Sequence, residues 1–185
     1  GWPMGPAYLP DVMGLDTLSH IIEVICAGYP QRMTATPLEP TKVLAGHRRH
    51  GQKSGIGFYR YEADATGRRR KLQQPDSYQL LAASQAAGTR DFTDAEIVER
   101  MMLPMVLEAA VALEEGIVES AAELDTAMSL GLGFPKQAGG PLQYADRLGL
   151  DQLVALSDRH ARLGPLYVAS EQVRRMAANR QRFFA

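Results

Sequence analysis

The stretch Gly1–Leu18, GWPMGPAYLPDVMGLDTL, returns in altered form at Gly133–Leu153, GFPKQAGGPLQYADRLGLDQL. Both stretches open with glycine, an aromatic residue and proline, and both continue through Gly-Pro to an aspartate and then to Gly-Leu-Asp. Agreement at so many glycine, proline and aspartate positions indicates a duplicated unit. The repeat therefore predicts that one helical arrangement occurs twice in this chain.

The register between the two stretches changes once. Gly1 aligns with Gly133, whereas Gly5 aligns with Gly140, so the second stretch carries an insertion of three residues. Each stretch predicts a turn followed by two helices, because Gly-Pro places proline in a first helical turn, where its missing amide costs nothing. The glycine before Leu-Asp then ends the short first helix.

A long apolar helix is predicted before the second stretch but not before the first. It spans about residues 93–116, and its middle, Met101–Leu107, is apolar on every face, which indicates a central, buried helix. The repeat predicts an equivalent helix ahead of Gly1, a residue that is no natural start. We therefore expect a first copy that is truncated at its N-terminus, with an uncovered apolar face on residues 4–27.

Four aspartates recur in the two stretches: Asp11 and Asp16 in the first, and Asp146 and Asp151 in the second. Carboxylates are favoured at the positive ends of helices, where they stabilise unpaired amide groups. We therefore expect all four to act as helix caps, and none as a catalytic residue.

Helical patterns dominate the rest of the chain. Apolar residues recur at helical spacing from Leu15 to Ile25, and Thr93-x-x-Glu96 and Ser120-x-x-Glu123 have the pattern of capping boxes. Few segments favour strands, so we predict an all-α fold. Helices are expected at residues 15–27, 41–45, 93–115, 120–131, 151–163 and 170–179.

Composition divides the chain into three parts. Residues 62–76, EADATGRRRKLQQPD, are polar, charged and poor in apolar side chains, which is typical of a linker or an exposed turn. We predict a partial first helical copy at residues 1–62, a linker with a short helix at 63–92, and a complete second copy at 93–185.

Overall composition excludes several classes of protein. The net charge is −1, which gives no indication of nucleic-acid binding, and no apolar run approaches the length of a membrane-spanning helix. The chain has one cysteine, Cys26, so an intramolecular disulfide is impossible. Cys26 lies in an apolar helix without a basic neighbour, and we expect it to be a small core residue.

Six segments, taken in order, resemble one known family. They are GWPMGPAYLPDVMGLDT, AGYPQRM, GQKSGIGFYRY, RMMLPMVLEAAVALEEGI, GLGFPKQAGGPLQYADRLG and LGPLYVASEQVRRMA. They resemble the C-terminal region of 3-hydroxyacyl-CoA dehydrogenases, and most closely the alpha subunits of bacterial fatty-acid β-oxidation multienzyme complexes. The resemblance implies two tandem copies of the dehydrogenase C-terminal helical domain.

The resemblance also implies a multifunctional parent enzyme. It would carry an enoyl-CoA hydratase domain and a Rossmann domain that binds NAD, and would oxidise L-3-hydroxyacyl-CoA to 3-ketoacyl-CoA. The catalytic histidine, its glutamate partner and a supporting asparagine would all precede Gly1, so we assign no catalytic residue, no cofactor-binding residue and no metal ligand here. The second copy has Leu107 in place of the asparagine.

Substrate contact is the function that the resemblance leaves to this chain. In the family the GWPMGP turn borders the acyl end of the substrate, which makes the candidate substrate-binding residues Trp2, Pro3, Met4, Gly5 and Pro6. Turn geometry alone explains the glycine and prolines, so only Trp2 and Met4 carry an independent argument for apolar contact.

Other charged groups have both a functional and a structural interpretation. Asp16, His20 and Glu23 share a helical face, but this spacing is common on solvated helices. The basic clusters His47–His50 and Arg68–Lys71 could meet the phosphates of coenzyme A, although charged loops are usually only solvated.

Two functional hypotheses follow. The first is the inactive C-terminal part of a cytoplasmic, NAD-dependent dehydrogenase that acts on acyl-CoA; the second is a non-catalytic helical module for assembly. The resemblance implies a thiolase subunit as partner in either case. The uncovered apolar face predicts that the isolated chain self-associates.

Overall fold

The computed structural model describes residues 1–34, 39–83 and 90–184. It is predominantly helical with one two-stranded sheet, so the predicted all-α class is confirmed. The chain forms two compact units, one of Met4–Asp91 and one in which Gly1–Pro3 joins Phe92–Ala185. Part of the predicted linker, at residues 84–89, lies outside the described residues.

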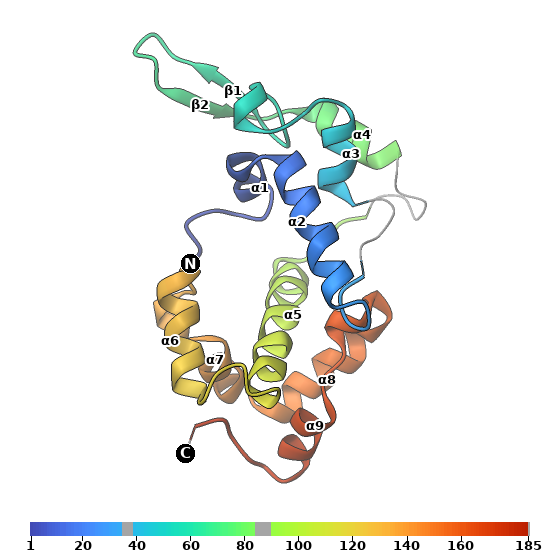
Figure 1. Cartoon of the computed structure of the whole chain (residues 1–185), viewed down its shortest axis with the longest axis vertical. Helices are drawn as coiled ribbons and strands as arrows, with labels where there is room; N and C mark the ends of the chain where they lie inside the picture. Colours follow the sequence, from blue (N-terminus) through green and yellow to red (C-terminus); the bar gives the residue numbers. More distant parts are fainter. Residues whose placement is uncertain (35–38, 84–89, 185) are drawn as a thin grey trace. The chain divides into compact units, whose positions relative to one another are not determined.

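In the described residues of the unit Met4–Asp91 there are four α-helices, a short 3-10 helix at Gln52–Ser54 and a hairpin. Leu15, Leu44, Phe58 and Leu81 form its buried core, and α2 and α3 lie side by side (Figure 1). The predicted helices at 15–27 and 41–45 are confirmed with a small extension at their ends. The helices are α1 Tyr8–Met13, α2 Leu15–Gly28, α3 Pro40–Gly46 and α4 Pro75–Ala83.

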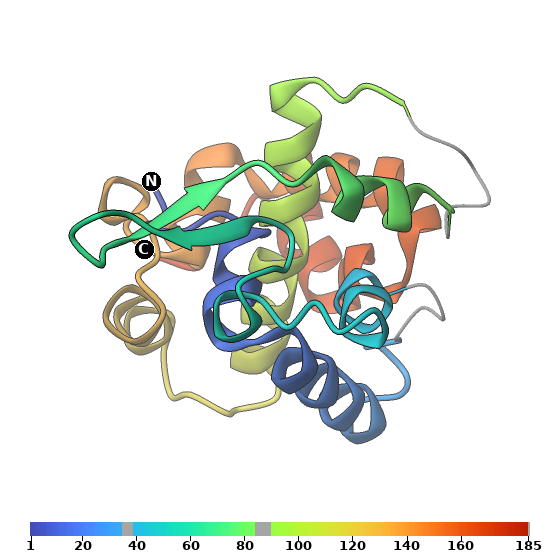
Figure 2. The same cartoon turned by 90° about the horizontal axis from the view of Figure 1, so that it is seen from above.

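The hairpin consists of β1 Arg60–Ala63 and β2 Arg69–Leu72, which pair antiparallel with Arg60 opposite Leu72. Its turn is built by Asp64, whose Oδ1 accepts hydrogen bonds from the amides of Thr66 and Arg68 at 2.9 and 3.0 Å. The hairpin projects from the rest of its unit (Figure 2). It therefore exposes nearly all of its side chains.

The second unit is built around α5, which has α6 and α7 on one side and α8 on the other (Figures 1 and 2). Leu103, Val106 and Leu107 of α5 are buried, but Met101 is 48% exposed. The helix is therefore buried along one face, and the prediction of burial on every face was wrong. The helices are α5 Asp94–Glu114, α6 Ala121–Gly131, α7 Pro141–Leu148, α8 Leu150–His160 and α9 Glu171–Ala178.

Both predicted capping boxes start helices. The Thr93 hydroxyl accepts from the amide of Glu96, and the Ser120 hydroxyl accepts from the amide of Glu123, each at 3.2 Å. The Glu123 carboxylate reaches back one residue further than the usual box, to the amide of Glu119 at 2.9 Å. Local sequence therefore fixes these helix starts.

The duplicated stretches have the same geometry. Gly14 separates α1 from α2 at φ 98° and ψ 122°, and Gly149 separates α7 from α8 at φ 92° and ψ 131°. Asp16 and Asp151 lie in the first turns of α2 and α8, near the positive helix ends, but they do not cap them: Gly14 and Gly149 occupy the N-cap positions, without a side-chain cap hydrogen bond. The repeat in sequence is thus a repeat in structure.

Asp11 and Asp146 do not cap helices, and that prediction was wrong. The two oxygens of Asp11 accept the amides of Phe58 and Tyr59 at 2.8 and 2.9 Å. Those of Asp146 accept the amides of Phe183 and Phe184, both at 2.9 Å. Each carboxylate therefore holds the backbone of two consecutive aromatic residues against the short helix that carries the aspartate. We call this arrangement the carboxylate clamp.

Replacing Asp11 with Ala should lower the free energy of unfolding of the unit Met4–Asp91 by about 3 kcal/mol. Asp11 is completely buried, so its loss leaves the amides of Phe58 and Tyr59 without an acceptor. Urea denaturation followed by circular dichroism measures the change. Asp16→Ala is the control, since Asp16 is exposed and should cost less than 1 kcal/mol; equal effects of both variants would contradict the clamp.

Candidate functional site

The predicted substrate residues fall on both sides of the boundary between the compact units. Gly1–Pro3 belong with Phe92–Ala185, and Met4, Gly5 and Pro6 belong with the other unit. Trp2 and Met4 are partly buried, whereas Pro3, Gly5 and Pro6 are exposed. The only apolar side chains of the segment that are partly enclosed are thus those of Trp2 and Met4.

Trp2 packs against its own counterpart in the repeat. Its ring meets the Phe134 ring edge to face, with centroids 5.5 Å apart. Phe134 is 1% exposed, and its amide donates to the carbonyl of Met128 at 3.2 Å, so the ring has a fixed position. An open groove of about 490 Å³ adjoins this contact and is lined by residues that include Gly1, Pro135 and Tyr144.

Asp125 holds the start of the helix in the second stretch. Its oxygens accept the amides of Leu142 and Gln143, each at 2.9 Å, in the first turn of α7. Burial raises the pKa of Asp125 above its usual value, although these two hydrogen bonds oppose the shift. Gly140 lies directly against Asp125, and a side chain at that position would overlap the carboxylate.

The clamp of the first copy has a third donor. The Tyr61 hydroxyl donates to Asp11 at 2.8 Å, and burial together with this bond raises the pKa of the Tyr61 phenol. Gly57 approaches Asp11 so closely that a Cβ there would overlap the carboxylate. The Ser77 hydroxyl donates to the Gly57 carbonyl at 2.5 Å.

Asp16, His20 and Glu23 do not converge on a site. Asp16 pairs with Lys53, and Glu23 pairs with Lys42 at 2.7 Å. Within residues 1–34, 39–83 and 90–184, no group of His, Cys, Asp and Glu is placed to hold a metal ion. No helix in the same ranges is both long and apolar enough to cross a membrane.

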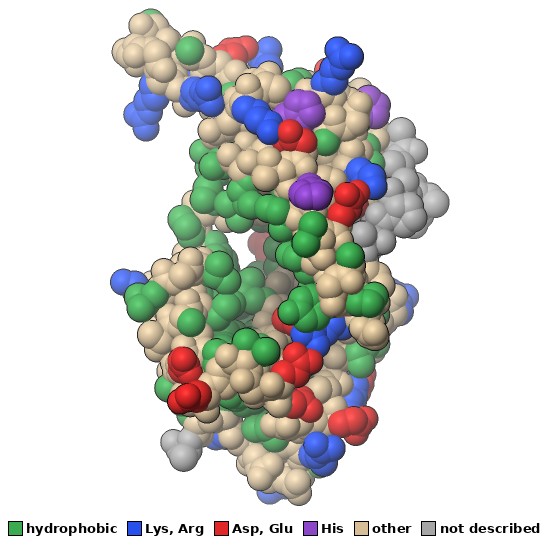
Figure 3. All heavy atoms as spheres, viewed as in Figure 1, with side chains coloured by type: hydrophobic (Ala, Val, Ile, Leu, Met, Phe, Trp, Pro, Cys, Tyr) green, Lys and Arg blue, Asp and Glu red, His purple; other side chains and the backbone are tan. Residues whose placement is uncertain are grey.

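The basic clusters His47–His50 and Arg68–Lys71 differ in the contacts that their side chains make within the protein. His47 Nδ1 lies 2.9 Å from the carbonyl of Val43, and Arg49 donates to the Ser77 hydroxyl at 2.7 Å. The hairpin is more open, and Lys and Arg side chains gather on it (Figure 3). Lys71 of this hairpin lies over the ring of Tyr8, 4.3 Å from its centroid.

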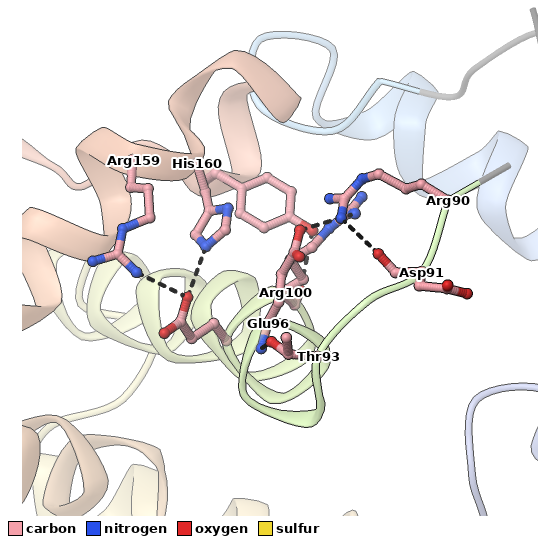
Figure 4. A network of polar contacts seen from close by, with 9 residues as sticks. Arg90, Asp91, Thr93, Glu96, Arg100, Arg159 and His160 are labelled. Carbon is pink, nitrogen blue, oxygen red and sulfur yellow. Dashed lines mark hydrogen bonds and ion pairs between the residues drawn. The ribbon is translucent and has the colours of Figure 1, made fainter. Parts of the chain in front are cut away.

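Sequence reasoning missed a polar contact inside the second unit. His160 lies between Arg159 and Arg162 in the sequence, a pattern typical of a helix surface, but it is 7% exposed, and its Nε2 lies 3.1 Å from the Glu99 carboxylate (Figure 4). Arg159 reaches the same carboxylate at 3.4 Å. The Tyr167 ring lies beside His160, with ring centroids 6.1 Å apart, and the Tyr167 hydroxyl donates to the carbonyl of Arg100 at 3.0 Å. Helical spacing places His160 on the α5 side of α8, which was the missed signal.

A model of the 3-hydroxyacyl-CoA dehydrogenase C-terminal domain matches residues 1–61 and 97–183. The chain belongs to this family. Over its whole length it is 45% identical to a fatty acid oxidation complex subunit alpha of Pseudomonas paraeruginosa, and it spans 26% of that relative. The chain thus covers about a quarter of the length of such curated relatives.

Solved structures share the fold of this dehydrogenase C-terminal domain. The dehydrogenase part of multifunctional enzyme 1 from C. elegans is 26% identical, with a TM-score of 0.65 over 95% of this chain and 39% of that one. A 3-hydroxybutyryl-CoA dehydrogenase from Escherichia coli, at 21% identity and a TM-score of 0.69, covers 97% of this chain and 52% of its own. At that identity the second likeness shows the fold alone.

Two positions in this dehydrogenase C-terminal domain have structural rather than chemical roles. Leu107 is 3% exposed within the apolar core of the second unit. Gly55–Gly57 leads through Phe58 and Tyr59 into β1, and not into a helix, so it cannot present amides to a dinucleotide phosphate. Gly57 is also packed against Asp11. These residues therefore do not fit NAD.

Replacing Phe134 with Leu should expose Trp2 and shift its fluorescence to longer wavelength. Trp2 is the only tryptophan, so its emission reports this contact directly. The loss of the edge-to-face contact should also cost about 1 kcal/mol beyond the change in burial. Phe134→Tyr is the control, because it retains the ring. An unchanged spectrum for Phe134→Leu would exclude the Trp2–Phe134 contact.

Proposed function

We propose that this chain is the C-terminal part of an enzyme of fatty-acid β-oxidation. The enzyme would oxidise L-3-hydroxyacyl-CoA to 3-ketoacyl-CoA with NAD, and would carry enoyl-CoA hydratase activity in an additional domain. The observation that carries the proposal is the 45% identity to a fatty acid oxidation complex subunit alpha along the entire chain. The family match over two segments supports the dehydrogenase activity in particular.

Within such an enzyme, the chain would form one wall of the substrate cleft and provide contacts for assembly. Trp2 and Met4 would offer apolar surface to the acyl chain, and Pro3, Gly5 and Pro6 would shape the turn that carries them. NAD would be bound and the proton of the substrate hydroxyl removed by segments that precede Gly1 in the longer protein. Gly57 is packed against Asp11 of the clamp, which is consistent with this division.

A role in assembly is the second candidate, and both roles can coexist. The relative's name places it in a complex, and a thiolase subunit is the partner that we propose for the longer protein. We propose a cytoplasmic location on the same grounds. A longer protein without a Gly-x-Gly-x-x-Gly strand–turn–helix ahead of this chain would favour the assembly module alone.

The isolated chain should not oxidise NADH in the presence of acetoacetyl-CoA. The measurement is the decrease in NADH absorbance, with the longer protein assayed under the same conditions as the control. In the longer protein, Trp2→Ala should raise KM for the acyl-CoA several-fold, because apolar contact would be lost. Turnover by the isolated chain, or none by the longer protein, would contradict the proposal.

The isolated chain should self-associate through α1 and α2. Val24 and Ile25 are 57% and 41% exposed on α2, and Leu9, Val12 and Met13 are each at least 40% exposed on α1. Exposed apolar surface drives association in water. Sedimentation velocity should show dimers or larger species, and the double variant Val24→Lys, Ile25→Glu should be monomeric. A monomeric unmodified chain at high concentration would exclude this.

A further inference from the structure

The second copy contains a cavity of about 370 Å³ at the start of α8. One wall is the N-terminal turn of α8, where the carboxylate of Asp151 stands, and the other is the segment that follows α9. In the part of the chain that the structure describes, Asp151 has neither an ion pair nor a side-chain hydrogen bond. Its lining includes Gly149, Asp151, Arg180 and Arg182.

The equivalent place in the first copy is filled. There Lys53 extends onto Asp16, the counterpart of Asp151, with Nζ 2.7 Å from Oδ2 and 2.5 Å from Oδ1. The Lys53 stem also covers Gly14, the counterpart of Gly149. This contact lowers the pKa of Asp16.

The two places are equivalent because the surrounding backbone is the same. Among the described residues other than glycine, only Arg48 and Arg180 have positive φ, at 57° and 53°. Arg48 follows α3, which packs against α2, and Arg180 follows α9, which packs against α8. From there the first copy runs through residues 51–57 to Phe58, whereas the second reaches Phe183 directly. Residues 51–57, which carry Lys53, are therefore an insertion that the second copy lacks.

We propose that the cavity beside Asp151 binds a lysine side chain that a partner protein presents on a tight, glycine-containing turn. The first copy supplies the geometry of the occupant, since Lys53 is flanked by Gly51 and Gly55 with φ of 83° and 78°. Glycine alone adopts such angles without strain. The ammonium meets Asp151, and the stem covers Gly149.

The arginines in the lining do not make this an anion site. Their counterparts in the first copy are also basic, Arg48 and His50, and His50 Nδ1 lies 4.0 Å from Asp16 alongside Lys53. A lysine ammonium is therefore accepted next to basic neighbours in this geometry. Because the carboxylate is exposed, the pair contributes orientation and selectivity more than affinity.

The test uses the complete chain and two acetylated, amidated peptides, GQKSGIG and its lysine-to-glutamine form GQQSGIG. Two-dimensional NMR should show the first peptide perturbing the amide signals of Gly149 and Asp151, with roughly two- to fivefold weaker binding for the second, the difference typical of an exposed ion pair. The chain variant Asp151→Asn should reduce binding by a similar factor. The matched variant Asp16→Asn should leave it unchanged, since Lys53 occupies that site.

Three outcomes would overturn the proposal. The first is the absence of perturbation at Gly149 and Asp151 up to the solubility limit of the lysine peptide. The second is equal binding of the lysine and glutamine peptides. The third is a stronger perturbation of the same signals by inorganic phosphate than by the lysine peptide, which would identify an anion site at the N-terminus of α8 instead.

Discussion

A carboxylate that accepts two consecutive backbone amides is the interaction on which both copies depend. Asp11, Asp125 and Asp146 all make it, with every distance from carboxylate oxygen to amide nitrogen at 2.8 or 2.9 Å. Hydrogen bonds to a charged acceptor are about twice as strong as those between neutral groups, and the geometry fixes the direction of the bound segment. A short helix is thereby joined to a segment far away in the sequence.

The clamp also explains how the two copies could diverge without losing their fold. It specifies only the aspartate and the two amides that it binds, so the segment between α3 and Phe58 can differ in length from the segment between α9 and Phe183. In the first copy the additional residues bring Lys53 onto the start of α2 and Gly57 against Asp11. The second copy retains an open surface at the same place.

Local sequence predicted the helices and failed where the contacts are long-range. Thr93 and Ser120 bond to amides three residues away, so a capping pattern was sufficient to find both helix starts. Asp11 was misassigned because the amides that it accepts come from residues 58 and 59, which no local pattern links to it. The burial of His160 has the same cause, since its partner Glu99 lies on α5 and no local pattern links the two residues.

The sequence also predicted the segment that forms the candidate site, but not the contacts that this segment makes. The repeat identified the segment that contains Trp2, but spacing could not indicate that its ring would pack on Phe134, the residue aligned with it. The proposed contact between this segment and the substrate comes from the family resemblance and not from the geometry. The cavity beside Asp151 had no sequence signal, because it results from residues that one copy has and the other lacks.

The distances that the clamps span along the chain have a consequence for the order of events during synthesis on the ribosome. Asp11 can meet its amides once residues up to Tyr61 have emerged, and the first copy can then consolidate while translation continues. Asp146 can accept its two amides only after Phe183 and Phe184 have emerged. The clamp of the second copy therefore closes later during synthesis than the clamp of the first copy.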